Sequence, residues 1–126
     1  MSYKNLTVLI VDDFITMRRI VRKILRDLDF EDIIEAEDGS AAMEVLQRTS
    51  VDLIISDWNM PKMTGLELLK QVRSTESLKD TPFLMLTAEA QKENIVEAIK
   101  EKVSNYIVKP FTAAVLEEKL AKILPR

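Results

Sequence analysis

Short apolar runs alternate along the chain with segments in which apolar residues recur every three or four positions. The runs are solid rather than alternating, and they occupy 6–11, 33–36, 51–56, 82–87 and 105–108. Helical spacing follows each run, at 17–28, 42–46, 66–72, 89–102 and 116–124. Solidly apolar strands are typical of a parallel sheet with helices on both faces. The pattern therefore predicts an α/β fold, a doubly wound (βα)5 sandwich around a five-stranded parallel sheet.

The composition limits what such a fold can do. The chain has 126 residues with no cysteine and no histidine, which excludes disulfides, thiolate metal sites and imidazole catalysis. A formal net charge of −3 argues against nucleic acid as the main partner. Neither a signal peptide nor a membrane span is found by pattern. We expect a single cytoplasmic domain over 1–126, with no output domain and no membrane insertion.

Polar residues lie where the predicted strands end. Asp12 and Asp13 follow the first strand, Asp57 ends the third, Thr87 the fourth, and Lys109 follows the fifth. Ligands of open parallel sheets bind beyond these carboxyl ends. Three carboxylates together repel one another unless a cation lies among them. Oxygen ligands without His or Cys favour a hard ion, Mg²⁺ or Mn²⁺.

Each of these residues also has a purely structural interpretation. Asp13 is well placed to cap the following helix, and capping is also the commoner role of a threonine such as Thr87. Asp57 alone fits a turn, and Lys109 fits a structural counter-ion. Their joint placement at four strand ends is harder to attribute to chance.

Four motifs carry a resemblance to a known family. They are Val11-Asp12-Asp13, Asp57-Trp58-Asn59-Met60-Pro61, Thr87-Ala88-Glu89 and Lys109-Pro110-Phe111. In order and spacing they resemble the response-regulator receiver domains, and the similarity covers the whole chain. Further matches at 13–20 and 109–114, with Tyr106, resemble the stand-alone receivers of chemotaxis. The resemblance implies a flavodoxin-like receiver fold and a signalling role, not a classical enzyme.

The resemblance also implies roles at the phosphorylation site. Asp57 would accept a phosphoryl group and become an aspartyl phosphate. Asp12 and Asp13 would hold Mg²⁺ together with Asp57 and the backbone carbonyl of Asn59. Lys109 and Thr87 would meet the phosphoryl oxygens, because phosphoryl transfer needs an in-line nucleophile and positive charge on those oxygens.

A conformational switch is implied by the same family. Thr87 would move inward, Tyr106 would turn inward, and the small Ala88 would leave space for that motion. Asn59 and Glu89 flank the site and would influence the lifetime of the phosphoryl group.

The last two helices and the fifth strand form the surface that the family uses for partners. The resemblance implies a histidine kinase as phosphodonor, a flagellar motor switch protein as target, a dedicated phosphatase, and a monomeric state. The residues expected on this surface are Lys92, Ile95, Ile99, Tyr106, Val115, Lys119 and Lys122. For any single lysine, an ordinary solvated position is the simpler interpretation.

The turn before the predicted fifth strand departs from the family pattern. Lys102 lies where a glycine would end the helix in the left-handed conformation, and Asn105 replaces a second glycine, so we expect a strained or reshaped turn. The first helix carries Arg18, Arg22 and three further basic residues opposite its apolar stripe, which favours a solvated or protein-docking face.

Three alternatives compete with a motor-binding regulator. A phosphate sink or phosphorelay receiver would use the same site without binding the motor. A Mg²⁺ phosphohydrolase would need an acid/base carboxylate two residues beyond the nucleophile, where Asn59 stands, and a cap domain. A flavodoxin-like nucleotide binder would have a phosphate loop where Asp12 and Asp13 lie.

Overall fold

The computed structural model describes residues 3–88 and 92–124 and contains the strand–helix alternation that the sequence predicts. The elements are β1 (Thr7–Val11), α1 (Ile15–Asp27), β2 (Asp32–Ala36), α2 (Gly39–Arg48), β3 (Leu53–Asp57), α3 (Gly65–Ser74), β4 (Phe83–Thr87), α4 (Lys92–Lys100), β5 (Asn105–Val108) and α5 (Ala113–Ile123). Within the described residues, no helix is both long and apolar enough to cross a bilayer.

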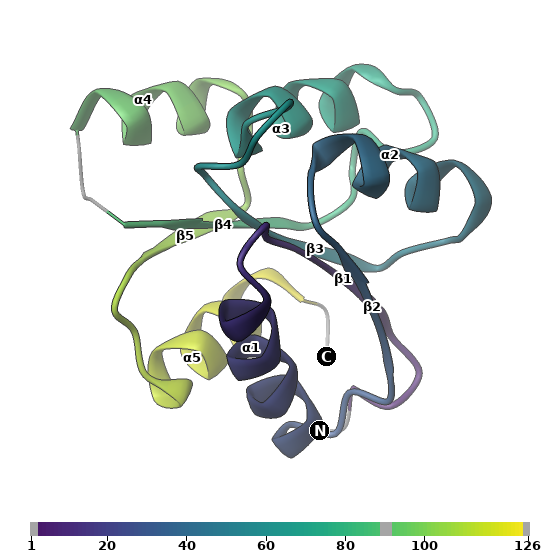
Figure 1. The fold of residues 1–126 in the computed structure, drawn as a ribbon, viewed down its shortest axis with the longest axis vertical. Helices are drawn as coiled ribbons and strands as arrows, with labels where there is room; N and C mark the ends of the chain where they lie inside the picture. Colours follow the sequence, from purple (N-terminus) through teal and green to yellow (C-terminus); the bar gives the residue numbers. More distant parts are fainter. Residues whose placement is uncertain (1–2, 89–91, 125–126) are drawn as a thin grey trace.

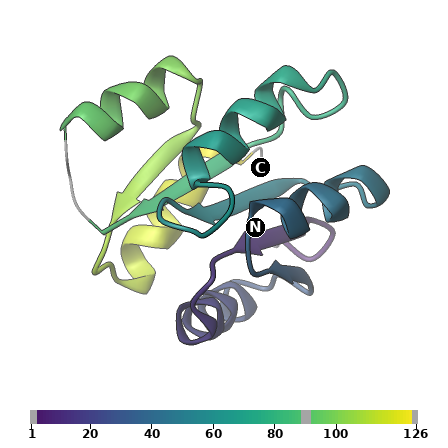
Figure 2. The same cartoon turned by 45° about the horizontal axis from the view of Figure 1, so that its top comes forward.

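All the strands pair in parallel, in the order β2-β1-β3-β4-β5. Helices α1 and α5 cover one face of the sheet, and α2, α3 and α4 cover the other (Figure 1). The same two layers remain separate when the molecule is turned (Figure 2). The strand order reverses at β1, which lies between β2 and β3, so a crevice is expected beyond the carboxyl ends of β1 and β3.

The sheet separates two apolar cores, because successive side chains of a strand point to opposite faces. On β1, Val8 and Ile10 pack toward α1 and α5, together with Leu25 and Leu116. Leu9 and Val11 belong to the core under α2 and α3. The solid apolar runs of the sequence are thus explained by burial on both faces.

Strand boundaries shift by one or two residues from the predicted runs. β3 starts at Leu53, after Asp52, whose side chain accepts the Thr7 N–H at 2.8 Å. β3 ends at Asp57, which is therefore the last residue of the strand. β4 starts at Phe83, one residue later than predicted, since Pro82 lacks an N–H for the ladder.

The helical stripes are less complete than the periodicity suggested. Ile20 is 46% exposed and Ile99 59% exposed, whereas Ala98 is the side chain of α4 that reaches the core. The polar face of α1, opposite its apolar stripe, also makes hydrogen bonds within the protein.

Candidate functional site

Four strands present polar residues at the same edge of the sheet. Asp57 pairs in register with Leu86, and Thr87, the next residue of β4, pairs with Val108, which precedes Lys109. The Lys109 N–H donates to the carbonyl of Thr87 at 2.7 Å. The parallel register therefore brings Asp57, Thr87 and Lys109 together, as the sequence predicts.

Three carboxylates form a cluster at this edge. Asp12, Asp13 and Asp57 each offer an oxygen, and these atoms lie within 4.8 Å of one another. Asp12 and Asp57 are buried, while Asp13 is exposed. Oxygen donors at this spacing fit a hard divalent cation that keeps several waters, and the exposed Asp13 leaves the cluster open to solvent.

Lys109 supplies the positive charge of the site. Its ammonium lies 2.6 Å from Asp57 Oδ1 and 3.9 Å from Asp12 Oδ2. The lysine side chain is 19% exposed, so the pair with Asp57 is largely shielded from water. A shielded cation beside this carboxylate offers a charged donor to any oxygen brought next to it.

Asp12 is less completely satisfied than Asp57. Its Oδ1 accepts the N–H of Phe14 at 2.9 Å, whereas Oδ2 is buried without a hydrogen-bond partner among the described residues. Burial raises the pKa of Asp12 to about 6, against the lowering effects of the Phe14 hydrogen bond and of Lys109. An orphaned, buried carboxylate oxygen within a three-carboxylate cluster is the observation that best fits a bound cation.

The structural roles considered from sequence are partly excluded. The N-cap residue of α1 is Phe14, which has no side-chain cap, so Asp13 does not cap that helix. Thr87 is buried at the end of β4, and residues 89–91, which lead into α4, lie outside the described residues, so a capping role of Thr87 stays a prediction. Ala88 and Asn59 are exposed beside the site. Glu89 lies outside the described residues.

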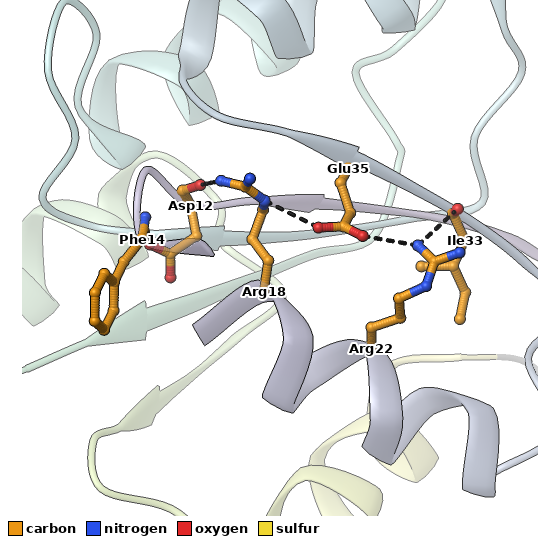
Figure 3. Close-up of polar contacts among 6 residues, drawn as sticks. All are labelled: Asp12, Phe14, Arg18, Arg22, Ile33 and Glu35. Carbon is orange, nitrogen blue, oxygen red and sulfur yellow. Dashed lines mark hydrogen bonds and ion pairs between the residues drawn. The ribbon is translucent and has the colours of Figure 1, made fainter. Parts of the chain in front are cut away.

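The sequence analysis did not identify one part of the site. Arg18 donates to the Asp12 carbonyl at 2.5 Å and to Glu35 at 2.9 Å, and Arg22 also pairs with Glu35 at 2.8 Å (Figure 3). The face of α1 that the sequence predicts to be solvated or to dock a protein is therefore partly taken up by contacts within the protein at Arg18 and Arg22. Glu35 is a charged residue within β2, and this charge is the sequence signal that could have indicated an ion pair with the arginines of α1.

The expected partner surface is partly apolar. Ile99 is 59% and Val115 38% exposed, and Ile95 is half-buried. The Lys122 ammonium pairs with Glu118 at 3.6 Å. The Lys92 side chain lies outside the described residues.

Tyr106 joins this surface to the sheet. Its ring is half-buried, and the Lys119 ammonium lies 5.5 Å from the ring centroid. The same ammonium donates to Asn105 Oδ1 at 3.2 Å. The residues predicted from sequence on β5 and α5 therefore lie side by side.

The turn before β5 contains the predicted left-handed residue. Lys102 has φ of 64°. Its carbonyl accepts the Nε–H of Arg73 at 3.0 Å. Asn105 instead begins β5, paired with Leu84, so the second replaced glycine is accommodated as extended strand. A left-handed lysine costs roughly 1 kcal/mol.

Fold and site together define the class. A (βα)5 flavodoxin-like fold that brings an acidic cluster and a lysine to the carboxyl ends of its strands is the architecture of a receiver domain. The chain belongs to the family described as response regulator receiver domain, whose model matches residues 8–121. This is a family of two-component signalling proteins rather than of classical enzymes.

Individual relatives place the chain close to the chemotaxis regulators. It is 55% identical over 123 residues to chemotaxis protein CheY-3 of Vibrio cholerae serotype O1, covering 98% of this chain and 95% of that protein. It is 53% identical over 119 residues to chemotaxis protein CheY of Pseudomonas aeruginosa, covering 94% and 96%.

Solved structures agree. A structure of the chemotaxis response regulator CheY4 of Vibrio cholerae matches with a TM-score of 0.88 at 39% identity, covering 94% of this chain and 98% of that chain. The signal receiver domain of a histidine kinase from Syntrophus aciditrophicus matches at 0.85 and 27% identity, covering 93% and 88%. The predicted fold and family are confirmed.

Proposed function

We propose that this chain is a stand-alone chemotaxis response regulator that accepts a phosphoryl group from a histidine kinase on Asp57, with Mg²⁺ bound beside it. The observation that carries the proposal is the pairing of one carboxylate, Asp57, with the Lys109 ammonium at 2.6 Å, inside a cluster of three carboxylates. The chain is 53–55% identical to chemotaxis regulators over nearly their whole length, which supports a regulator of the same kind.

The cation would be held by Asp12, Asp13, Asp57 and the backbone carbonyl of Asn59, with Mn²⁺ as a substitute. When bound, Mg²⁺ would neutralise charge on the transferring phosphoryl group. The Asp12 Oδ2 supports this assignment, because a cation would satisfy a buried oxygen that has no hydrogen-bond partner among the described residues.

Asp57 would act as the nucleophile. Its carboxylate oxygen forms a bond to phosphorus while the bond from phosphorus to the donor imidazole nitrogen breaks. Lys109 and the Thr87 hydroxyl would contact the arriving phosphoryl oxygens, where fixed donors in a partly dehydrated site are effective. Slow hydrolysis of the aspartyl phosphate would reset the protein, at a rate influenced by Asn59 and Glu89.

Phosphorylation would change the surface formed by α4, β5 and α5. A phosphoryl group adds a charge of up to about −2 beside Lys109 and Thr87, which draws both toward it. Thr87 would move inward past Ala88, and Tyr106 would follow. Lys92, Ile95, Ile99, Val115, Lys119 and Lys122 would then meet a flagellar motor switch protein.

The cellular setting follows from the same proposal. We expect a monomeric regulator in the cytoplasm, phosphorylated by a histidine kinase and reset with the help of a dedicated phosphatase. If a motor-switch peptide binds neither the phosphorylated nor the unphosphorylated protein, the chain is instead a phosphate sink or a phosphorelay receiver.

Intact-mass measurement tests the proposal. Wild type, Asp57→Asn and the exposed control Asp80→Asn are incubated with acetyl phosphate and Mg²⁺. We expect one phosphoryl adduct on wild type and Asp80→Asn, and none on Asp57→Asn or in EDTA. An absent adduct on wild type, or an equal adduct on Asp57→Asn, contradicts the mechanism.

A further inference from the structure

Arg18 connects the acidic loop to the neighbouring strand. It lies in the first turns of α1, and its side chain is 14% exposed. One nitrogen, Nη1, donates to the backbone carbonyl of Asp12, and Nε donates to Glu35 on β2 (Figure 3). A planar guanidinium donates its hydrogen bonds in fixed directions, so it holds the two acceptor groups in a set geometry.

The hydrogen bond from Arg18 to the Asp12 carbonyl is the third contact that holds Asp12 in place. The Asp12 N–H donates to the Ala36 carbonyl at 3.1 Å, and its Oδ1 accepts the Phe14 N–H at 2.9 Å. Arg18 fixes the third group, the carbonyl, and with it the plane of the peptide that leads into Asp13. The direction in which Asp13 leaves the strand therefore depends on Arg18.

The positive charge of Arg18, taken alone, would weaken cation binding at the carboxylate cluster. A guanidinium next to a carboxylate cluster repels a divalent ion. Glu35 offsets this charge, with its carboxylate shared between Arg18 and Arg22 at 2.9 and 2.8 Å. We infer that Arg18 is a positioning residue for the divalent-cation site, acting through the Asp12–Asp13 backbone rather than through its charge. The inference rests on the proposed function.

The chain offers a matched control in Arg22. It lies one turn further along α1 and pairs with the same Glu35, but its second contact is the carbonyl of Ile33 at 3.4 Å, away from the acidic loop. Replacing either arginine leaves Glu35 paired with the other. Arg22→Ala therefore removes the same kind of ion pair without releasing Asp12.

Cation binding is measured by fluorescence without any phosphodonor. The single tryptophan of the chain, Trp58, follows Asp57 directly and reports on the site. Mg²⁺ and Ca²⁺ are titrated into wild type, Arg18→Ala, Arg18→Lys and Arg22→Ala, each first shown to be folded by circular dichroism. Asp57→Asn provides the reference for a changed ligand set.

We expect Arg18→Ala to weaken Mg²⁺ binding about 10-fold, the usual loss on removing an outer-shell partner. Ca²⁺ binding should weaken less, because Ca²⁺ tolerates irregular geometry and Mg²⁺ does not. Arg18→Lys, which cannot reproduce the two-acceptor fork, should also weaken Mg²⁺ binding. Arg22→Ala should stay within about twofold of wild type, below the 10-fold scale of an outer-shell loss.

Tighter Mg²⁺ binding by Arg18→Ala would show that charge dominates and would overturn the inference. An unchanged affinity, an equal loss in Arg22→Ala, or no Mg²⁺ binding by wild type would overturn it as well. Failure of the proposed function is seen separately: a wild type that binds Mg²⁺ through an Arg18-dependent site but gives no phosphoryl adduct refutes the phosphorylation and keeps the positioning role.

Discussion

Two helices of this protein begin after strands that carry acidic residues of the site, and they begin in different ways. α3 starts with a capping box, in which Thr64 accepts the Glu67 N–H and the Glu67 carboxylate accepts the Thr64 N–H. The N-cap residue of α1 is Phe14, whose side chain makes no capping hydrogen bond. There, the Asp12 carboxylate accepts the Phe14 N–H and Arg18 takes the Asp12 carbonyl.

The difference shows which loop is arranged for stability and which for chemistry. The capping box at the start of α3 satisfies two backbone N–H groups within four residues. Before α1 lies Asp12, whose buried carboxylate has a raised pKa and an oxygen without a hydrogen-bond partner among the described residues, and whose backbone carbonyl is held by Arg18. Burying a carboxylate this way costs stability unless a cation is bound.

The largest effect is expected where α3 touches Asp57. A Cβ on Gly65 would clash with the backbone oxygen of Asp57, and backbone does not yield easily. Gly65→Ala should lower the free energy of unfolding by about 1–3 kcal/mol, the range for overpacking, and should slow phosphorylation. Urea unfolding and acetyl phosphate kinetics provide the two measurements.

Gly39 provides the matched control, since it is also the first residue of its helix. The three atoms nearest its added Cβ are Cβ, Cγ and Sδ of Met63, each at 2.7 Å. We expect Gly39→Ala to cost less stability than Gly65→Ala, because Cγ and Sδ of a methionine can move, whereas the backbone oxygen of Asp57 cannot. Equal losses in the two variants would contradict the role of the Asp57 contact.

The second effect concerns the buried carboxylate at the start of α1. With a pKa of about 6 in the folded protein against 3.8 as the reference, Asp12 binds more protons folded than unfolded. Without divalent cations, stability should therefore fall as the pH rises from about 4 to 6, by up to about 3 kcal/mol at 1.36 kcal/mol per unit. Asp12→Asn should lose this part of the slope.

Urea unfolding in EDTA at several pH values measures the slope, with Asp80→Asn as control. Above pH 6, Asp12→Asn should be more stable than wild type. Mg²⁺ should reduce this difference in the free energy of unfolding, because it binds and stabilises wild type alone. Parallel stability curves for wild type and Asp12→Asn across this range would rule out the cost of the buried carboxylate.

The smallest effect separates the two helix starts directly. Thr64→Ala removes a cap and should cost about 1 kcal/mol. It should also raise the lowered pKa of Glu67 by only part of its shift, because the first cause of the lowering, the hydrogen bond from the Thr64 backbone N–H, does not need the side chain. Phe14→Ser adds a cap at a side chain that is 60% exposed and should stabilise α1 by up to about 1 kcal/mol.

Thermal unfolding and carboxyl NMR titration measure these changes. The comparison fails if Thr64→Ala has no cost, or if Phe14→Ser destabilises the protein although the helix has no competing cap.

The sequence was sufficient for the fold because burial on both faces makes the strands solidly apolar and the register follows from parallel pairing. It also predicted the proximity of Asp12, Asp57, Thr87 and Lys109, since strand ends meet at one edge. Helical periodicity gives only the angle of a side chain, not what lies opposite. For that reason the contact of Arg18 with the Asp12 carbonyl, and the exposure of Ile20, were not predicted.

The central claim is that Asp57 accepts the phosphoryl group while Asp12 and Asp13 hold the cation. Borohydride reduces an aspartyl phosphate to homoserine, which fragmentation mass spectrometry locates in the tryptic peptides 5–18 and 49–62. After treatment with acetyl phosphate and Mg²⁺, the account predicts homoserine at Asp57 in peptide 49–62 and none in peptide 5–18. Homoserine at Asp12 or Asp13, or none at Asp57, would contradict it.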